Sequence, residues 1–275
     1  MSVFMLAEIA RLVRYYILTC TTKAGSGHPT SSLSATDLMV GLMFNQFRLG
    51  FDRLIFSKGH ASPLFYSLYA AAGLLKPEEL YTLRKFGSAI EGHPTPKFKL
   101  AEVASGSLGQ GLSVGLGMAL NAKYLDKTSY LTYVLLGDSE LAEGSNWEAM
   151  SLAAHYKLNN LIAILDVNRL GQANPTMHGW DLAAYEAKAQ AFGWATKIID
   201  GHDFNQIAPA LSLAGTTASK PLMIIAKTIK GKGVSFLEDK DGWHGKALNE
   251  ADYHRAIKKL GKINLGKTWT IKSAN

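Results

Sequence analysis

The chain has 275 residues, of which 47% are hydrophobic and 19% charged, so it can bury the core of one large domain spanning residues 1–275. Its single cysteine, Cys20, excludes an internal disulfide and a cysteine-rich metal site. The formal charge of +7 fits an anionic cofactor or partner. Nucleic acid is a weaker alternative, because neither zinc-finger spacing nor an aromatic RNA-binding pattern accompanies the charge. We expect a cytoplasmic protein that binds neither nucleic acid nor membrane.

The first predicted element is an amphipathic helix near the N-terminus, within residues 1–20. Three charged residues, Glu8, Arg11 and Arg14, interrupt this apolar stretch before it reaches the length of a signal-peptide core. No other stretch approaches the roughly 20 apolar residues of a membrane span. One face of the helix would carry five apolar residues: Ile9, Leu12, Val13, Tyr16 and Ile17.

Strands and helices alternate through the rest of the chain. Apolar runs typical of strands cover residues 130–136, 161–166, 195–199 and 222–226. Helical patterns cover residues 109–124, 146–156, 182–192 and 204–213. This alternation predicts an α/β fold with a doubly wound, mostly parallel sheet and helices on both faces. Ligands of such sheets bind at the carboxyl ends of the strands.

Oxygen-bearing side chains follow two of the predicted strands. Asp138 comes directly after the first run, and Asn168 lies just past the end of the second. With the backbone carbonyl of Leu170, they would give three hard oxygen ligands to Mg²⁺, which commonly completes its octahedron with phosphate and water. Each residue could equally cap a turn, so both interpretations stay open.

A glycine-rich stretch, Gly106 to Gly111, precedes the predicted helix at residues 109–124. Unpaired N–H groups at the start of a helix suit a phosphate. A dinucleotide site is disfavoured because the order of glycines is not G-x-G-x-x-G. Close helix packing is an equally good explanation of these glycines.

Four of the eight histidines lie beside glycine in predicted loops: His28, His60, His93 and His244. Imidazole can donate a hydrogen bond or carry a proton near neutral pH, so these loops are typical of a polar substrate site. A zinc site is disfavoured because no closely spaced ligand set is present.

Taken together, these motifs resemble the N-terminal part of transketolases over nearly the whole chain, most closely the animal-type and split bacterial forms. The matching segments, in order, are Gly25-Ser26-Gly27-His28-Pro29, Ser57-Lys58-Gly59-His60-Ala61, Gly92-His93-Pro94, Ser107-Leu108-Gly109-Gln110-Gly111, Gly137-Asp138 followed by Glu140-Leu141-Ala142-Glu143-Gly144 and Trp147-Glu148-Ala149, Asp166-Val167-Asn168-Arg169-Leu170-Gly171-Gln172, Ile225-Ala226-Lys227-Thr228, and Trp243-His244-Gly245-Lys246.

The resemblance implies a thiamine diphosphate-binding fold and assigns roles to individual residues. The implied Mg²⁺ ligands are Asp138, Asn168 and the Leu170 carbonyl, with Ca²⁺ or Mn²⁺ as substitutes for Mg²⁺. The implied cofactor-binding residues are His60, Ser107, Leu108, Gly109, Gly137, Asp138, Glu143, Asn168, Lys230 and His244. The implied catalytic residues are His28, His60, His93, His244 and Glu143, and Glu143 and Glu148 would form a carboxylate relay towards an interface between chains.

One position departs from the family pattern. Ser139 stands where the family has the second glycine of a Gly-Asp-Gly turn. If that turn needs a positive φ, serine would weaken cofactor binding.

The resemblance also implies a partner, because complete transketolases are more than twice as long. Their pyrimidine-binding and C-terminal domains would lie on a separate chain, which would supply the glutamate that protonates the cofactor's aminopyrimidine. We therefore expect an α2β2 heterotetramer, active only when complete. It would transfer a two-carbon ketol unit from a ketose phosphate to an aldose phosphate, as in the pentose phosphate pathway. The alternatives are a component of another thiamine enzyme and a non-catalytic cofactor-binding subunit.

Overall fold

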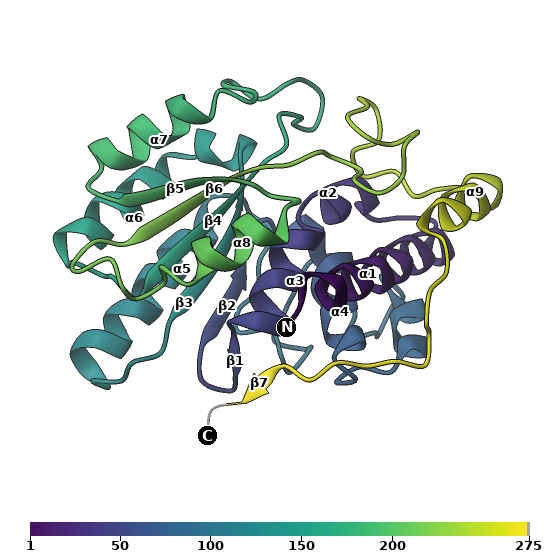
Figure 1. Cartoon of the computed structure of the whole chain (residues 1–275), viewed down its shortest axis with the longest axis horizontal. Coiled ribbons are helices and arrows are strands. Elements are labelled where there is room, and N and C mark those ends of the chain that lie inside the picture. The colour runs from purple at the N-terminus through teal and green to yellow at the C-terminus, as the bar shows by residue number, and fades with distance from the viewer. Residues whose placement is uncertain (274–275) are drawn as a thin grey trace.

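The computed structural model describes residues 1–273 and forms an α/β fold built on a parallel sheet (Figure 1). Its helices are α1 (Val3–Ala24), α2 (Pro29–Ser34), α3 (Thr36–Asn45), α4 (Ser62–Ala71), α5 (Gln110–Leu120), α6 (Gly144–His155), α7 (Leu182–Ala191), α8 (Phe204–Leu211) and α9 (Glu250–Leu260). Its strands are β1 (Arg48–Leu49), β2 (Arg53–Phe56), β3 (Thr132–Gly137), β4 (Leu161–Val167), β5 (Ala195–Asp200), β6 (Leu222–Lys227) and β7 (Lys272–Ser273).

The main sheet has the strand order β2-β3-β4-β6-β5, with every neighbouring pair parallel. Strands β3 and β4 are buried along their whole length. Parallel strands covered on both faces read as continuous apolar runs, which is why they could be recognised in the sequence. The predicted doubly wound parallel sheet is confirmed.

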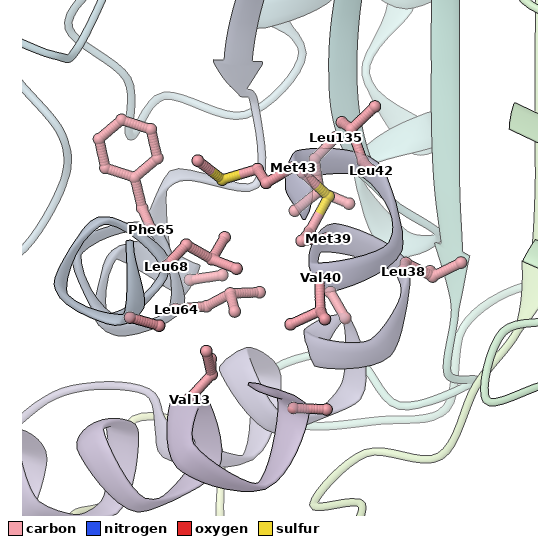
Figure 2. Close-up of a cluster of buried hydrophobic side chains, with 14 of the residues drawn as sticks. Val13, Leu38, Met39, Val40, Leu42, Met43, Leu64, Phe65, Leu68 and Leu135 are labelled. Carbon is pink, nitrogen blue, oxygen red and sulfur yellow. The ribbon is translucent and has the colours of Figure 1, made fainter. Parts of the chain in front are cut away.

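Helices cover both faces of the sheet (Figure 1). Along β3, Tyr133 and Leu135 face the core shared with α1, α3, α4 and α8, whereas Val134 and Leu136 face the core shared with α5, α6 and α7. This alternation is the two-residue period of a strand. Figure 2 shows part of the first core, where Val13 of α1, Met39 and Val40 of α3, and Leu64 and Leu68 of α4 point toward one another.

The N-terminal helix α1 is confirmed, and the five residues predicted to share its apolar face are all buried. Cys20 on the same helix is buried and free, as its place in the pattern indicated. Helices α2 to α4 and strand β2 were not predicted. Helix α3 is buried on nearly every side, so it lacks the polar face that produces a helical period.

Several boundaries differ from the predictions by a few residues. Helix α5 ends at Leu120 and continues as one π-helical turn, Asn121–Leu125. A further helix that was not predicted, α9, packs on α1, with Ala256 and Leu260 buried. Within residues 1–273, no helix has the length and apolar character to cross a membrane.

Candidate functional site

The carboxyl ends of β3 and β4 form the floor of a small pocket. Their register pairs Gly137 with Asp166, so the residues that follow each strand, Asp138 and Asn168, come out at the same edge of the sheet. Because β3 and β4 are neighbouring parallel strands, they bring Asp138 and Asn168 close together, as predicted. The pocket is lined by most of the residues predicted from the sequence: His60, Leu108, Gly137, Asp138, Asn168, Leu170, Lys230 and His244.

Asp138 is held in one orientation by three hydrogen bonds. Its Oδ1 accepts from the Ser139 N–H at 2.9 Å, while its Oδ2 accepts from the Arg169 N–H at 2.7 Å and the Thr176 hydroxyl at 3.2 Å. Burial, and then the neighbouring charge of Asp166, raise the pKa of Asp138 to about 6 against the opposing effect of Lys58. Because its charge is poorly compensated, Asp138 has a physical reason to take up a cation.

The remaining oxygens of the candidate metal site are neutral. Asn168 Oδ1 accepts from the Leu170 N–H at 3.2 Å, and the Leu170 carbonyl accepts from the Lys230 ammonium at 2.9 Å. Within residues 1–273, no group of three or more His, Cys, Asp or Glu side chains is placed to hold a metal ion. A cation here would therefore rest on one carboxylate, one amide oxygen and one carbonyl, an all-oxygen set that suits Mg²⁺ with further phosphate and water ligands.

A buried ion pair lies directly beneath these oxygens. The Lys58 ammonium is bonded to Asp166, which also accepts from the hydroxyls of Ser34 and Thr228. Lys58 and Asp166 are respectively 2% and 0% exposed. With its oxygens already engaged, Asp166 supports the pocket rather than offering a free ligand. Lys58 and Asp166 were not predicted to have this role from the sequence.

Three of the four predicted histidines form a cluster at the mouth of the pocket. Ring centroids lie 5.1 Å apart for His28 and His60, 4.9 Å for His28 and His244, and 5.3 Å for His60 and His244. The pKa of His28 is lowered to about 4 and that of His244 to about 3, mainly by burial and then by neighbouring charged groups. The pKa of His60 is lowered for the same reasons. The cluster is therefore neutral at pH 7.

The fourth histidine, His93, lies beside the glycine-rich stretch, where a Cβ on Gly106 would be 3.2 Å from its ring. Burial lowers the pKa of His93, with a further contribution from Arg84. Among the described residues, the buried Nδ1 of His28 has no hydrogen-bond partner. An unpaired buried nitrogen calls for an explanation, and a polar ligand in the pocket would supply one.

Lys230 is 3% exposed and reaches into the pocket from the segment after β6. Its ammonium donates to the carbonyls of Leu170 and Gly171, both at 2.9 Å, and lies 3.0 Å from His244 Nδ1. Burial lowers the pKa of Lys230 to about 8, and Lys58 contributes in the same direction. Its positive charge is thus available at neutral pH and is not neutralised by a contacting carboxylate.

The start of α5 differs from the prediction of unpaired N–H groups. The Gly109 N–H donates to Glu140 Oε1 at 2.8 Å, and the Gly111 N–H donates to the Ser57 hydroxyl at 3.1 Å. Glu140 also accepts from the Gly137 N–H at 3.1 Å and from the Ser57 hydroxyl. Two of the N–H groups expected to be free at this helix start are therefore paired within the protein.

Glu140 is a residue whose position in the site the sequence analysis missed. It is 1% exposed and connects the glycine-rich stretch to the turn after β3. Its only sequence signal was its place within the segment Gly137 to Gly144, which also contains the predicted Glu143. Glu143 and Glu148 are exposed at and near the start of α6, and Ser107 is exposed in the glycine-rich stretch. None of these three lines the small pocket.

The departure at Ser139 is accommodated without strain. Ser139 begins a short 3₁₀ turn, Ser139–Ala142, and is absent from the set of described non-glycine residues with positive φ. The expected conflict between serine and a positive φ therefore does not arise. Ser139 lies where the small pocket meets a wider hollow of about 600 Å³, which continues under residues 171–178 to the aromatic rings of Trp147 and Phe192.

Fold and site together define a parallel α/β protein with a polar, partly cationic pocket at the carboxyl edge of its sheet. The family model for the transketolase thiamine diphosphate binding domain matches residues 6–273. The chain belongs to this family.

Several relatives support the assignment. The transketolase of Pongo abelii is 48% identical over 251 residues, which cover 88% of this chain and 40% of that protein. One of the subunits of the apulose-4-phosphate transketolase of Phocaeicola vulgatus is 38% identical, and the match covers 89% of this chain and 92% of that polypeptide. Among solved structures, the transketolase of Campylobacter jejuni has a TM-score of 0.87 and 34% identity, covering 98% of this chain and 45% of that one. The chain thus spans about two fifths of the full-length transketolases it matches.

Proposed function

We propose that this chain is the thiamine diphosphate-binding part of a transketolase and transfers a two-carbon ketol unit between sugar phosphates together with a pyrimidine-binding partner chain. The observation that carries the proposal is the pocket at which Asp138, the neutral oxygens of Asn168 and Leu170, Lys230 and two histidines, His60 and His244, converge. A separate partner chain is supported by the Phocaeicola vulgatus relative, which is one subunit of a transketolase and is matched over nearly its whole length. We propose that the two chains form an α2β2 assembly.

The residues of the pocket fit a diphosphate bound through Mg²⁺. Asp138, Asn168 and the Leu170 carbonyl would hold the cation, and Lys230 and His244 would contact the diphosphate. When bound, the cofactor supplies the nucleophilic carbon of ketol transfer. We propose that His28, His60 and His93 donate hydrogen bonds to sugar hydroxyls or move a proton, because a neutral imidazole has one donor and one acceptor nitrogen.

The cofactor assignment is tested by calorimetric titration of thiamine diphosphate into the chain with and without Mg²⁺. Asp138→Asn is expected to abolish Mg²⁺-dependent binding, whereas Glu250→Gln, which changes an exposed carboxylate on α9, is expected to bind as the parent does. Equal binding by the parent and Asp138→Asn would contradict the metal assignment.

Catalysis is tested by ketol transfer from xylulose 5-phosphate to ribose 5-phosphate, with the chain alone and mixed with a candidate partner chain. Activity only in the mixture is expected. If the cofactor binds but both samples are inactive, either this sugar pair is wrong or the chain has no catalytic role. Repeating the assay with other ketose phosphates, apulose 4-phosphate included, separates these two outcomes.

A further inference from the structure

A second buried ionic cluster lies behind the pocket, outside every segment assigned to the site. The Arg14 guanidinium of α1 donates to both carboxylate oxygens of Asp37 on α3, at 2.9 and 2.6 Å. His202, in the turn after β5, contacts the same carboxylate through Nδ1 at 2.8 Å. Burial opposes the ionisation of Asp37, but Arg14 and His202 outweigh it and lower its pKa to about 2. The cluster therefore holds a charged carboxylate in the interior.

The cluster also binds the backbone on both sides of Lys230. The Ile229 N–H donates to His202 Nε2 at 2.9 Å, and Arg14 Nε donates to the Lys232 carbonyl at 3.1 Å. Between these two points, the Gly231 N–H donates to the Thr30 carbonyl at 3.0 Å. The segment that carries Lys230 is thus fixed at three successive places by groups from other parts of the fold.

The two contacts of His202 define its tautomer. Because Nε2 accepts from a backbone N–H, it carries no proton, and Nδ1 must be the nitrogen that donates to Asp37. His202 therefore links a carboxylate on α3 to a backbone amide after β6. Asparagine can reproduce only the contact made by Nδ1, and glutamine can reproduce the contact made by Nε2, so the two contacts can be removed separately.

We propose that Arg14, Asp37 and His202 form a positioning clamp for Lys230. The clamp holds the backbone from Ile229 to Lys232 so that the Lys230 ammonium reaches the Leu170 carbonyl at the candidate metal site. Without the clamp, we expect the long side chain of Lys230 to turn its ammonium towards water. The clamp deepens the proposed function, and its effect on cofactor affinity rests on that proposal. The effect of the clamp on the position of Lys230 does not depend on the proposed function.

Two replacements of His202 separate the contacts. His202→Asn retains a donor near Asp37 and removes the acceptor for the Ile229 N–H, whereas His202→Gln can reach Ile229 with its side-chain oxygen. Two measurements show how firmly the segment from Ile229 to Lys232 is held, and neither needs the cofactor. They are hydrogen exchange at Ile229 and acylation of Lys230, each followed by mass spectrometry. His202→Asn is expected to accelerate both, and His202→Gln to restore them to near the parent values.

The affinity for thiamine diphosphate with Mg²⁺ is the second readout. Loss of one buried hydrogen bond corresponds to about a tenfold change in affinity, so His202→Asn is expected to bind about tenfold more weakly and His202→Gln within about threefold of the parent. His254→Asn, at an exposed histidine on α9, is the matched control and is expected to change neither readout.

Exchange at Leu165, in the buried centre of β4, distinguishes the clamp from a general loss of stability. The clamp predicts a change at Ile229 and Lys230 with Leu165 unchanged. Unchanged exchange and acylation in His202→Asn would overturn it, as would equal effects of the two His202 variants. If the parent binds no thiamine diphosphate, the proposed function fails, while exchange and acylation still decide whether the clamp positions Lys230.

Discussion

Gly111 marks the closest approach between α5 and the segment after β2. A Cβ at Gly111 would lie 2.3 Å from Ser57 Cβ and 2.7 Å from Ser57 Cα, whereas nonbonded carbons pack at about 3.5–4.0 Å. Ser57 cannot retreat freely, because its hydroxyl is bonded to Glu140 and accepts from the Gly111 N–H. Gly111→Ala must therefore move α5 or Ser57 by about 1 Å, since the contact is too short by that amount.

The expected cost follows from three contributions. Overpacking costs about 1–3 kcal/mol, and loss of the hydrogen bond to Ser57 adds about 1 kcal/mol. The better helix propensity of alanine offsets about 1 kcal/mol. We expect Gly111→Ala to lower the free energy of unfolding by about 1–3 kcal/mol. Gly117 on the same helix has open space around its Cβ position, so Gly117→Ala is expected to raise it by about 1 kcal/mol.

The two variants are compared by urea unfolding of the isolated chain, with thiamine diphosphate titration as a second measurement. Displacing Ser57 also displaces Glu140, which binds the N–H groups of Gly109 and Gly137. Gly111→Ala is therefore expected to weaken cofactor binding, while Gly117→Ala binds normally. Equal stability of Gly111→Ala and the parent would refute the argument, as would a destabilised Gly117→Ala.

Three further predictions concern charges in and under the pocket. Lys58→Met leaves Asp166 buried without its cation and is expected to cost about 3–5 kcal/mol of unfolding free energy, measured by denaturant titration. His244 stays neutral in the folded chain but takes up a proton below its ordinary pKa when unfolded, so His244→Gln is expected to lose less stability than the parent between pH 7 and pH 5. Lys230→Met is expected to weaken thiamine diphosphate binding about tenfold through the loss of a charged contact, whereas Lys232→Met, two residues on, serves as the control; equal affinities would count against the role of Lys230.

The parts of the fold predicted from sequence are those in which one local pattern decides the structure. Strands β3, β4 and β6 are continuous apolar runs because both faces are covered, and α1 has an apolar face with charged interruptions. Strand β2 has only four residues, Arg53–Phe56, too few to show a period. Helix α3 is buried nearly all round, so burial removed the pattern by which amphipathic helices are recognised.

The site residues that could be predicted from the sequence are also those that follow a recognisable local pattern. Asp138 and Asn168 were predictable because both follow recognisable strands, and parallel strands bring their carboxyl ends together. Glu140 and His202 were not, because their roles depend on segments that meet only in the folded chain. The expectation of free N–H groups at the start of α5 was wrong for Gly109 and Gly111, since no local feature shows that Glu140 and Ser57 fold back onto them.

The charges of the pocket lead to a final prediction, that thiamine diphosphate binding depends on a divalent cation. Lys58 is already paired with Asp166, and Lys230 contacts carbonyls, so the ionised Asp138 would face an incoming diphosphate directly. Two like charges 4 Å apart repel by about 4 kcal/mol at an effective dielectric of about 20, which corresponds to about a thousandfold in affinity. A divalent cation between them converts this repulsion into two attractions. Chelating the metal with EDTA is therefore expected to weaken thiamine diphosphate binding by about that factor in calorimetry, and restoring Mg²⁺ to recover it; binding that ignores EDTA would show that Asp138 is not the metal ligand.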